Sequence, residues 1–178
     1  NKENTGYGNS MNIGFDAAIG EYIGIVESDD YVDSTMFESL YKEAKENDSD
    51  VVKSGYYLYY SIPKEKNVKV EIASPILCNR DICPVSSFKS KREQVDLFNI
   101  KPTIWSAIYR NDFIKNNNIR FNETPGASYQ DAGFNFKVLA CAKKLRLVKE
   151  AYLHYRQDNE SSSVNSKGKV FCVCDEYD

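Results

Sequence analysis

A short apolar segment that ends in a cluster of carboxylates constrains this chain most. Residues 22–26 are largely apolar, and Glu27, Asp29 and Asp30 follow them directly. A short apolar run bounded by turn residues is typical of a buried strand. Side chains that follow such a strand lie at the rim of an α/β sheet, where proteins of this class bind ligands.

Three carboxylates so close together repel one another unless a cation lies between them. Carboxylate oxygens are hard ligands that suit Mg²⁺ or Mn²⁺, and these ions commonly bind phosphates as well. The run therefore predicts a metal site for a diphosphate group. The alternative is a solvated acidic turn before the next helix, because negative charge is favourable at a helix N-terminus.

The composition excludes several classes of protein. The chain has 178 residues, 42% of them hydrophobic and 28% charged, which is enough for one globular domain with a core. Its net charge of −3 leaves no electrostatic footprint for nucleic acid or for an anionic membrane surface. No apolar run has the length of a membrane span. Five unevenly spaced cysteines argue for free thiols in a reducing cytoplasm rather than a disulfide framework.

The apolar spacing alternates between helical and strand periods, which predicts a single-domain α/β fold. A first helix carries Met11, Phe15 and Ala18 and ends at a cap near Gly20. We expect further helices from a cap at Asp33 or Ser34 to residue 47, over 90–99 behind the capping box of Ser90 and Glu93, from a cap at Asn111 to residue 117, and over 131–144. Strands are expected over 22–26, 50–60, 68–72, 103–109 and 145–153, with a loop over 73–88.

The N-terminal motifs, taken in order, resemble family 2 glycosyltransferases. They are Asn4-x-Gly6-x-Gly8, Asn12-x-Gly14, the segment 18–23 and Glu27-Ser28-Asp29-Asp30. Three downstream segments agree with the same family: 105–110, 129–131 and 154–163. The resemblance covers nearly the whole chain, and four motifs in the right order are far more specific than any one of them.

This resemblance implies a GT-A fold, with a mixed sheet flanked by helices. It implies an inverting enzyme that moves a sugar from a nucleotide-diphosphate sugar to a saccharide or lipid-linked acceptor. Mg²⁺ or Mn²⁺ would assist. The setting implied is cell-surface polysaccharide synthesis, in the cytoplasm or at the inner face of the membrane.

On the donor side, the resemblance implies that Asp29 is the best metal ligand. Glu27 would contact the metal or the ribose, and Asp30 would support the turn or the ion. Arg156 would clamp the diphosphate, although a surface ion pair is an alternative for this side chain. His154 lies on a predicted strand, which favours a structural role over one beside the diphosphate.

On the acceptor side, the resemblance implies that Asp131 is the general base, which takes the proton of the attacking hydroxyl. A helix N-cap is the competing interpretation, and the two are compatible. Tyr129 and Gln130 would contact the acceptor, and Trp105 would stack on a sugar ring unless it belongs to the core. Residues 161–163 would line a lid or form a loop.

Two departures from the family pattern affect these expectations. Glu27 stands where the family usually has Asp, and the extra methylene shifts the geometry of the metal or ribose contact. The strands that grip the nucleotide base would precede Asn1, so residues 1–178 are expected to be the C-terminal portion of one GT-A domain, without a complete donor pocket. Strand 22–26 would then have an unpaired edge, which favours a homodimer or covering by another segment.

Two other functions remain open from the residues alone. One is a saccharide-binding domain that does not turn over. The other is a nucleotidyltransferase, which also pairs carboxylates with phosphates. The sequence contains no basic glycine-rich triphosphate loop, and this weighs against the second.

Overall fold

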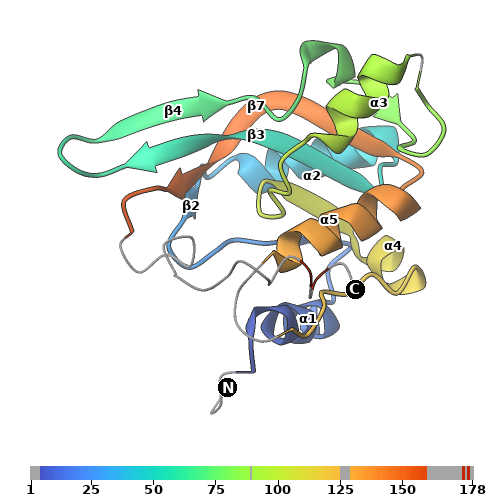
Figure 1. The fold of residues 1–178 in the computed structure, drawn as a ribbon, viewed down its shortest axis with the longest axis horizontal. Coiled ribbons are helices and arrows are strands. Elements are labelled where there is room, and N and C mark those ends of the chain that lie inside the picture. The colour runs from blue at the N-terminus through green and yellow to red at the C-terminus, as the bar shows by residue number, and fades with distance from the viewer. Residues whose placement is uncertain (1–4, 89, 125–128, 160–173, 175, 177–178) are drawn as a thin grey trace.

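A computed structural model describes residues 5–88, 90–124, 129–159, 174 and 176. Its centre is one mixed sheet of seven strands flanked by helices (Figure 1), which confirms the predicted fold class. The strands are β1 (Tyr22–Gly24), β2 (Tyr31–Val32), β3 (Val51–Tyr60), β4 (Lys66–Val70), β5 (Asp81–Ile82), β6 (Ala107–Arg110) and β7 (Leu145–Arg156). The helices are α1 (Tyr7–Ala17), α2 (Met36–Asn47), α3 (Lys91–Phe98), α4 (Asn111–Asn116) and α5 (Gln130–Cys141), with a 3-10 turn at Pro75–Leu77.

The two long strands β3 and β7 form the middle of the sheet and run parallel. The strand order is β1-β6-β3-β7-β2, and β4 and β5 pair with β3 and β7. Every pair except β3–β7 is antiparallel. The carboxyl ends of both long strands therefore lie at the same edge, where ligand sites of open α/β sheets are found.

Alternating side chains of the central strands point to two different helical layers. Val52 and Ile108 belong to the cluster formed by Met36, Leu40 and Ala44 of α2. Their neighbours Val51 and Tyr109 belong to the cluster formed by Phe134 and Val138 of α5. In Figure 1, α2 lies behind the sheet and α5 lies in front of it. Among the described residues, no helix is long and apolar enough to cross a membrane.

The helices and the longer strands lie close to their predicted positions. The Ser90 hydroxyl accepts a hydrogen bond from the Glu93 N–H at 3.2 Å, so the expected cap of α3 is confirmed. The expected caps at Gly20, Asp33 or Ser34, Asn111 and Asp131 are wrong, because the cap residues are Ala18, Thr35, Arg110 and Tyr129. The Asn111 amide instead donates to the carbonyls of Ala18 and Gly20, at 3.1 and 2.7 Å.

The strands β2 and β5 and the 3-10 turn are not among the expected elements. β2 consists of two residues, and its Tyr31 and Val32 pair with His154 and Leu153 of β7. Pairing with β3 continues β7 to Arg156, beyond the expected end at residue 153. The pairing of β2 with β7 brings the acidic run, which immediately precedes β2, to the carboxyl end of β7.

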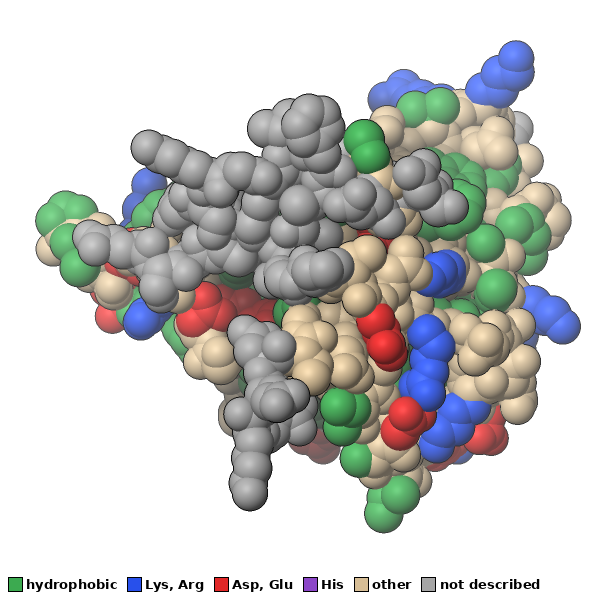
Figure 2. Space-filling model, turned by 60° about the horizontal axis from the view of Figure 1, so that its bottom comes forward, with side chains coloured by type: hydrophobic (Ala, Val, Ile, Leu, Met, Phe, Trp, Pro, Cys, Tyr) green, Lys and Arg blue, Asp and Glu red, His purple; other side chains and the backbone are tan. Residues whose placement is uncertain are grey.

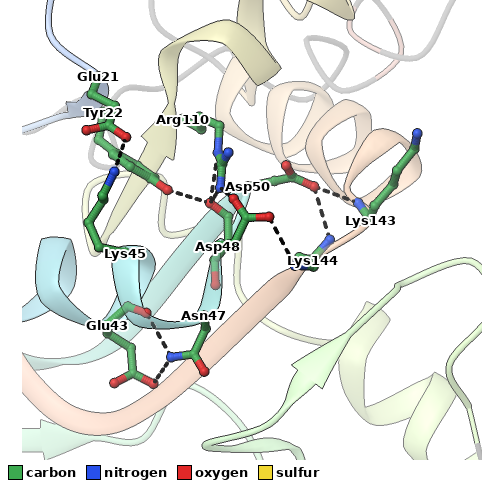
Figure 3. A network of polar contacts seen from close by, with 11 residues as sticks. Glu21, Tyr22, Glu43, Lys45, Asn47, Asp48, Asp50, Arg110, Lys143 and Lys144 are labelled. Carbon is green, nitrogen blue, oxygen red and sulfur yellow. Dashed lines mark hydrogen bonds and ion pairs between the residues drawn. The ribbon is translucent and has the colours of Figure 1, made fainter.

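A polar network ties the opposite, amino ends of β3 and β7 together (Figure 3). Asp48 accepts hydrogen bonds from Arg110 at 2.6 Å and from Lys144 at 3.1 Å. Asp50 accepts from the main-chain N–H groups of Lys143 and Lys144, at 2.9 and 3.0 Å. Because this network lies at the other end of the central strands from the acidic run, it stabilises the scaffold without entering the candidate site.

Candidate active site

The helix α1 forms one wall of the site, and two glycines let it dock there. Gly6 has φ 90°, which favours glycine because it lies in the left-handed region. A Cβ atom on Gly8 would lie 1.9 Å from the Asn122 carbonyl oxygen, so only glycine permits this close approach. Asn12, which is buried, then exchanges two hydrogen bonds of 3.0 Å with the main chain of Phe121. These contacts give a physical reason for the glycines and asparagine of the first two motifs.

The docked α1 helix carries a tyrosine to the acidic run. The Tyr7 hydroxyl donates a hydrogen bond to Oε1 of Glu27 at 2.5 Å. Burial raises the pKa of Tyr7, and the Glu27 carboxylate raises it further, so Tyr7 remains a donor at neutral pH. Burial also raises the pKa of Glu27, although the bond from Tyr7 opposes that shift.

The other two carboxylates of the run are held by the segment at the end of β7. Oδ2 of Asp29 accepts a hydrogen bond from the Asn159 amide at 2.9 Å. Oδ1 of Asp30 accepts one from the main-chain N–H of Arg156, also at 2.9 Å. Burial raises the pKa of Asp30 to about 6, despite that bond. Its Oδ2 is buried and has no partner among the described residues.

Asp131 lies in the first turn of α5. This helix runs antiparallel to β7, the strand that follows it in the chain (Figure 1). Oδ1 of Asp131 accepts a hydrogen bond from the Ala132 N–H at 2.9 Å. Burial raises the pKa of Asp131, while that N–H and the charge of Lys53 lower it. A carboxylate with a raised pKa is a better proton acceptor than an exposed one, as a general base requires.

The structure brings the two acidic segments together, although about a hundred residues separate them in the sequence. After burial, the charges of Asp29 and Asp131 are what raise the pKa of Glu27. Tyr155 also lies within the field of all four carboxylates, and together with its burial they raise its pKa. Figure 2 shows acidic side chains on this face, beside the atoms drawn in grey.

Lys53 is a cation buried beneath this acidic site. It lies on β3 two residues after Val51, its side chain is 1% exposed, and its Nζ donates to the Thr103 carbonyl oxygen at 2.8 Å. Burial lowers the pKa of Lys53 to about 7, and the Asp131 carboxylate opposes that shift. Lys53 lies between a valine and a serine on a strand, and this local sequence does not indicate a buried charge near the site. We did not predict this residue.

The residues before Asp131 differ in how they are placed. Tyr129 is 50% exposed and has φ 59°, which is uncommon for an aromatic residue and marks a constrained backbone. Gln130 is 1% exposed, and its amide donates to Oγ1 of Thr124 at 2.8 Å. In this arrangement Gln130 is buried and braces the segment before α5. Its contact with an acceptor stays a prediction.

Trp105 is half-buried and lies between Tyr155 and Tyr56. Its ring centroid is 5.0 Å from that of Tyr155 and 4.9 Å from that of Tyr56. It packs against both hydrophobic clusters of the core. The structure therefore gives Trp105 a place in the core, and its stacking on a sugar ring stays a prediction.

Arg156 and His154 lie at the end of β7. The Arg156 guanidinium is 5.7 Å from the centroid of the Tyr59 ring, and its Nε is 3.8 Å from Oδ1 of Asp158. This is the surface ion pair that we considered as an alternative, and the diphosphate contact stays a prediction. His154 stacks between Tyr31 and Tyr57 and bonds to Asn67 and Asp33, which agrees with a structural role. Residues 161–163 lie outside the described part of the chain.

The carboxylates fit a metal only in partnership with a substrate. Within the described residues, no group of three or more His, Cys, Asp or Glu side chains is arranged to hold an ion. Tyr7 occupies one oxygen of Glu27, and Asn159 occupies one oxygen of Asp29. Mg²⁺ sites that include substrate phosphates need only one or two protein carboxylates. Asp29 and Glu27 meet that requirement, since each keeps a second oxygen that bonds to no other described residue.

Comparisons with known proteins agree with this geometry. The model of the family described as "Glycosyl transferase family 2" matches residues 1–142. The glycosyltransferase EpsJ of Bacillus subtilis is 27% identical over 158 residues, which are 89% of this chain and 44% of that protein. The cholesterol galactosyltransferase of Borreliella burgdorferi is 30% identical over 171 residues, 92% of this chain and 46% of that protein. The chain thus spans about half the length of these relatives.

Solved structures show the same fold. The crystal structure of residues 1–349 of S. aureus TarS in complex with UDP-GlcNAc superposes with a TM-score of 0.65 at 21% identity. The match covers 92% of this chain and 42% of that one, so the fold described here corresponds to part of a GT-A glycosyltransferase. With a family match over most of its length and this fold, the chain belongs to glycosyl transferase family 2.

Proposed function

We propose that the protein containing this chain transfers a sugar from a nucleotide-diphosphate sugar to a saccharide or lipid-linked acceptor, with inversion. The observation that carries the proposal is the meeting of Glu27 and Asp29 with Asp131. One acidic segment would bind the diphosphate with its metal, and the other would supply the base. Inverting transfer requires a leaving group on one side of the sugar and an attacking hydroxyl on the other. Glu27 and Asp29 would serve the leaving diphosphate, and Asp131 would serve the hydroxyl.

Asp131 acts as the base in this proposal. The acceptor oxygen forms a bond to the anomeric carbon while the bond from that carbon to the diphosphate oxygen breaks. The hydroxyl proton passes to the Asp131 carboxylate, and the nucleoside diphosphate leaves with the bonding electrons. Attack opposite to the leaving group inverts the anomeric centre.

On the donor side, Asp29 and Glu27 would hold Mg²⁺ or Mn²⁺, which when bound neutralises the charge that develops on the diphosphate. Tyr7 fixes the orientation of Glu27 through its hydrogen bond. Asp30, bonded to the main chain of Arg156, keeps the acidic turn against β7. The Arg156 guanidinium would leave its ion pair with Asp158 to contact the diphosphate.

The relatives support the choice of donor and leave the acceptor broad. TarS has been solved with UDP-GlcNAc and with UDP, and one curated relative is named a cholesterol galactosyltransferase. We infer that residues 1–178 are the C-terminal portion of a single GT-A domain whose remaining part completes the donor pocket. We place the protein in the cytoplasm or at the inner face of the membrane, in the synthesis of cell-surface polysaccharide.

The test is the release of nucleoside diphosphate by the full-length protein, with UDP-sugars as donors. We expect Asp131→Asn to lower kcat by about 10²–10⁴-fold, the usual contribution of a general base. Asp29→Ala should weaken dependence on Mn²⁺ and lower turnover as well. Asp112→Asn is the matched control, because Asp112 is an exposed carboxylate of α4. Turnover at the wild-type rate in the Asp131→Asn protein would refute this assignment of the base.

A further inference from the structure

A cavity of about 260 Å³ is lined by residues from three parts of the chain. These are Tyr56 of β3, the end of β4 with the segment that follows it, and residues 96–101 at the end of α3. Polar side chains and one tyrosine contribute to its wall: Tyr56, Glu71, Ser74, Asp96, Asn99 and Lys101. None of these residues belongs to the site described above.

The polar groups of this wall are available to a ligand. Among the described residues, no hydrogen bond or ion pair involves the side chain of Ser74, Asp96 or Asn99. The wall also contains apolar side chains, among them Ile72 and Ile100. A mixture of apolar surface with a few polar groups is typical of a small-molecule site, although the volume lies below the ~300–1,000 Å³ of most such sites. It suits a single sugar ring.

Aromatic contacts connect the cavity to the carboxylates. Tyr155 is next to Arg156, whose main-chain N–H donates to Asp30. Trp105 contacts Tyr155 at a centroid distance of 5.0 Å, and on its other side contacts Tyr56 at 4.9 Å. Tyr56 in turn belongs to the wall of the cavity. Tyr56, Trp105 and Tyr155 therefore form a continuous row of rings from the cavity to the end of β7, which holds the acidic turn.

We propose that this cavity binds a second sugar unit of the acceptor, at a distance from the unit that is glycosylated. The inference rests on the proposed function, because it assigns an acceptor of more than one sugar unit to that reaction. Sugar hydroxyls donate to the carboxylates and accept from the amide and the ammonium, while the apolar face of the ring lies against the aliphatic side chains of the wall.

The charge of the wall favours a neutral sugar over other ligands. Glu71 and Asp96 would repel a phosphate or a nucleotide, and Lys101 supplies only one compensating charge. A lipid tail would leave these charged groups without water or partners, which is costly. A neutral sugar satisfies both the polar groups and the apolar surface.

The experiment measures binding of two probe series to the full-length protein by calorimetry. The probes are β-1,4-linked oligomers of glucose and of N-acetylglucosamine, from one to four units long. We expect the affinity to rise by about tenfold or more from one to three units in at least one series, equal to about 1.4 kcal/mol. Ser74→Trp fills the cavity and should abolish this gain, and Asp96→Ala should reduce it.

Gln94→Ala is the control, because Gln94 is exposed on the same helix and is not part of the wall. If Ser74→Trp does not fold, Asp96→Ala decides. Equal affinity for all lengths in both series, or a gain that survives both cavity variants, overturns the inference. Release of nucleoside diphosphate is measured separately: its absence, with the length dependence intact, would refute the proposed transfer and leave the sugar site standing.

Discussion

At the scale of single residues, opposing effects act on the pKa of Asp131. Its burial favours the protonated carboxylic acid, whereas Lys53 and the Ala132 N–H favour the carboxylate. The charge of Asp131 in turn raises the pKa values of Glu27, Glu176, Tyr7 and Tyr155. Lys53 is the one cation among the described residues that shifts the pKa of Asp131. The pKa of the proposed base therefore depends on a lysine that is almost fully buried.

We predict that Lys53→Met moves the acid limb of the kcat/KM profile of the full-length protein to higher pH. The pKa of Lys53 is about 7, so it is positively charged over the acidic range where a carboxylate titrates. Its charge lowers the pKa of Asp131, and removing it leaves the effect of burial less opposed. Methionine matches the length of the lysine stem, and the Ser106 hydroxyl still donates to the Thr103 carbonyl at 3.2 Å.

The matched control is Lys42→Met, which removes a positive charge from an exposed position on α2. Its acid limb should coincide with that of the wild-type protein. A purely structural role of Lys53 would change melting temperature or kcat and leave the position of the limb unchanged. Superimposable pH profiles for wild type and Lys53→Met would contradict the prediction.

At the scale of elements, the position of α1 decides whether Tyr7 reaches Glu27. We predict that Gly8→Ala destabilises the protein by about 1–3 kcal/mol, because the new methyl group would collide with the Asn122 main chain. Gly14→Ala on the same helix is the control. A Cβ atom there meets nothing within 4 Å, so this change should stabilise by about 0.5–1 kcal/mol through helix propensity.

Denaturant unfolding of both variants measures these free energies of unfolding. Turnover should fall in the Gly8→Ala protein, because a displaced α1 carries Tyr7 away from Glu27. Similar stabilities for the two alanine variants would mean that the contact between α1 and residue 122 carries no energy.

The elements also explain what the sequence could predict. The long strand β3 was predictable because ten consecutive residues rich in valine and tyrosine fit a buried strand. The strand β2 was not, since its two residues are held by pairing with β7 and by no local pattern. Lys53 was missed for a related reason. A lysine normally indicates an exposed position, and its burial arises only because β3 lies in the middle of the sheet.

In the site, the carboxylates of the run 27–30 and of Asp131 were predictable from their residue types and their order in the sequence. Their closeness in space follows from the fold. Tyr7 and Tyr155 were not predictable, because tyrosines are frequent in this chain and nothing local distinguishes these two. The cavity was beyond prediction as well, since its wall combines residues from three separate segments.

At the scale of the whole molecule, the sheet ends in β1. Within the described residues, β1 pairs with β6 alone, so no strand covers its other edge there. Ile19, just before β1, is 99% exposed. An open edge beside an exposed apolar side chain invites pairing with another chain.

We predict that residues 1–178, prepared alone, associate through this edge. Sedimentation velocity over a range of concentrations should detect a dimer, and Ile19→Lys should weaken it by placing a charge beside the edge. Ile62→Lys is the control, since Ile62 is 73% exposed at the far hairpin between β3 and β4. A monomer at every concentration would count against the prediction.

The link between Asp30 and position 156 has a consequence for how such enzymes diversify. The carboxylate accepts its hydrogen bond from the main chain of Arg156, and the guanidinium takes no part in it. Any residue other than proline can supply the same N–H. The side chain at 156 is therefore free to vary without loosening the acidic turn. A lineage can exchange this residue while the geometry of the turn is inherited unchanged.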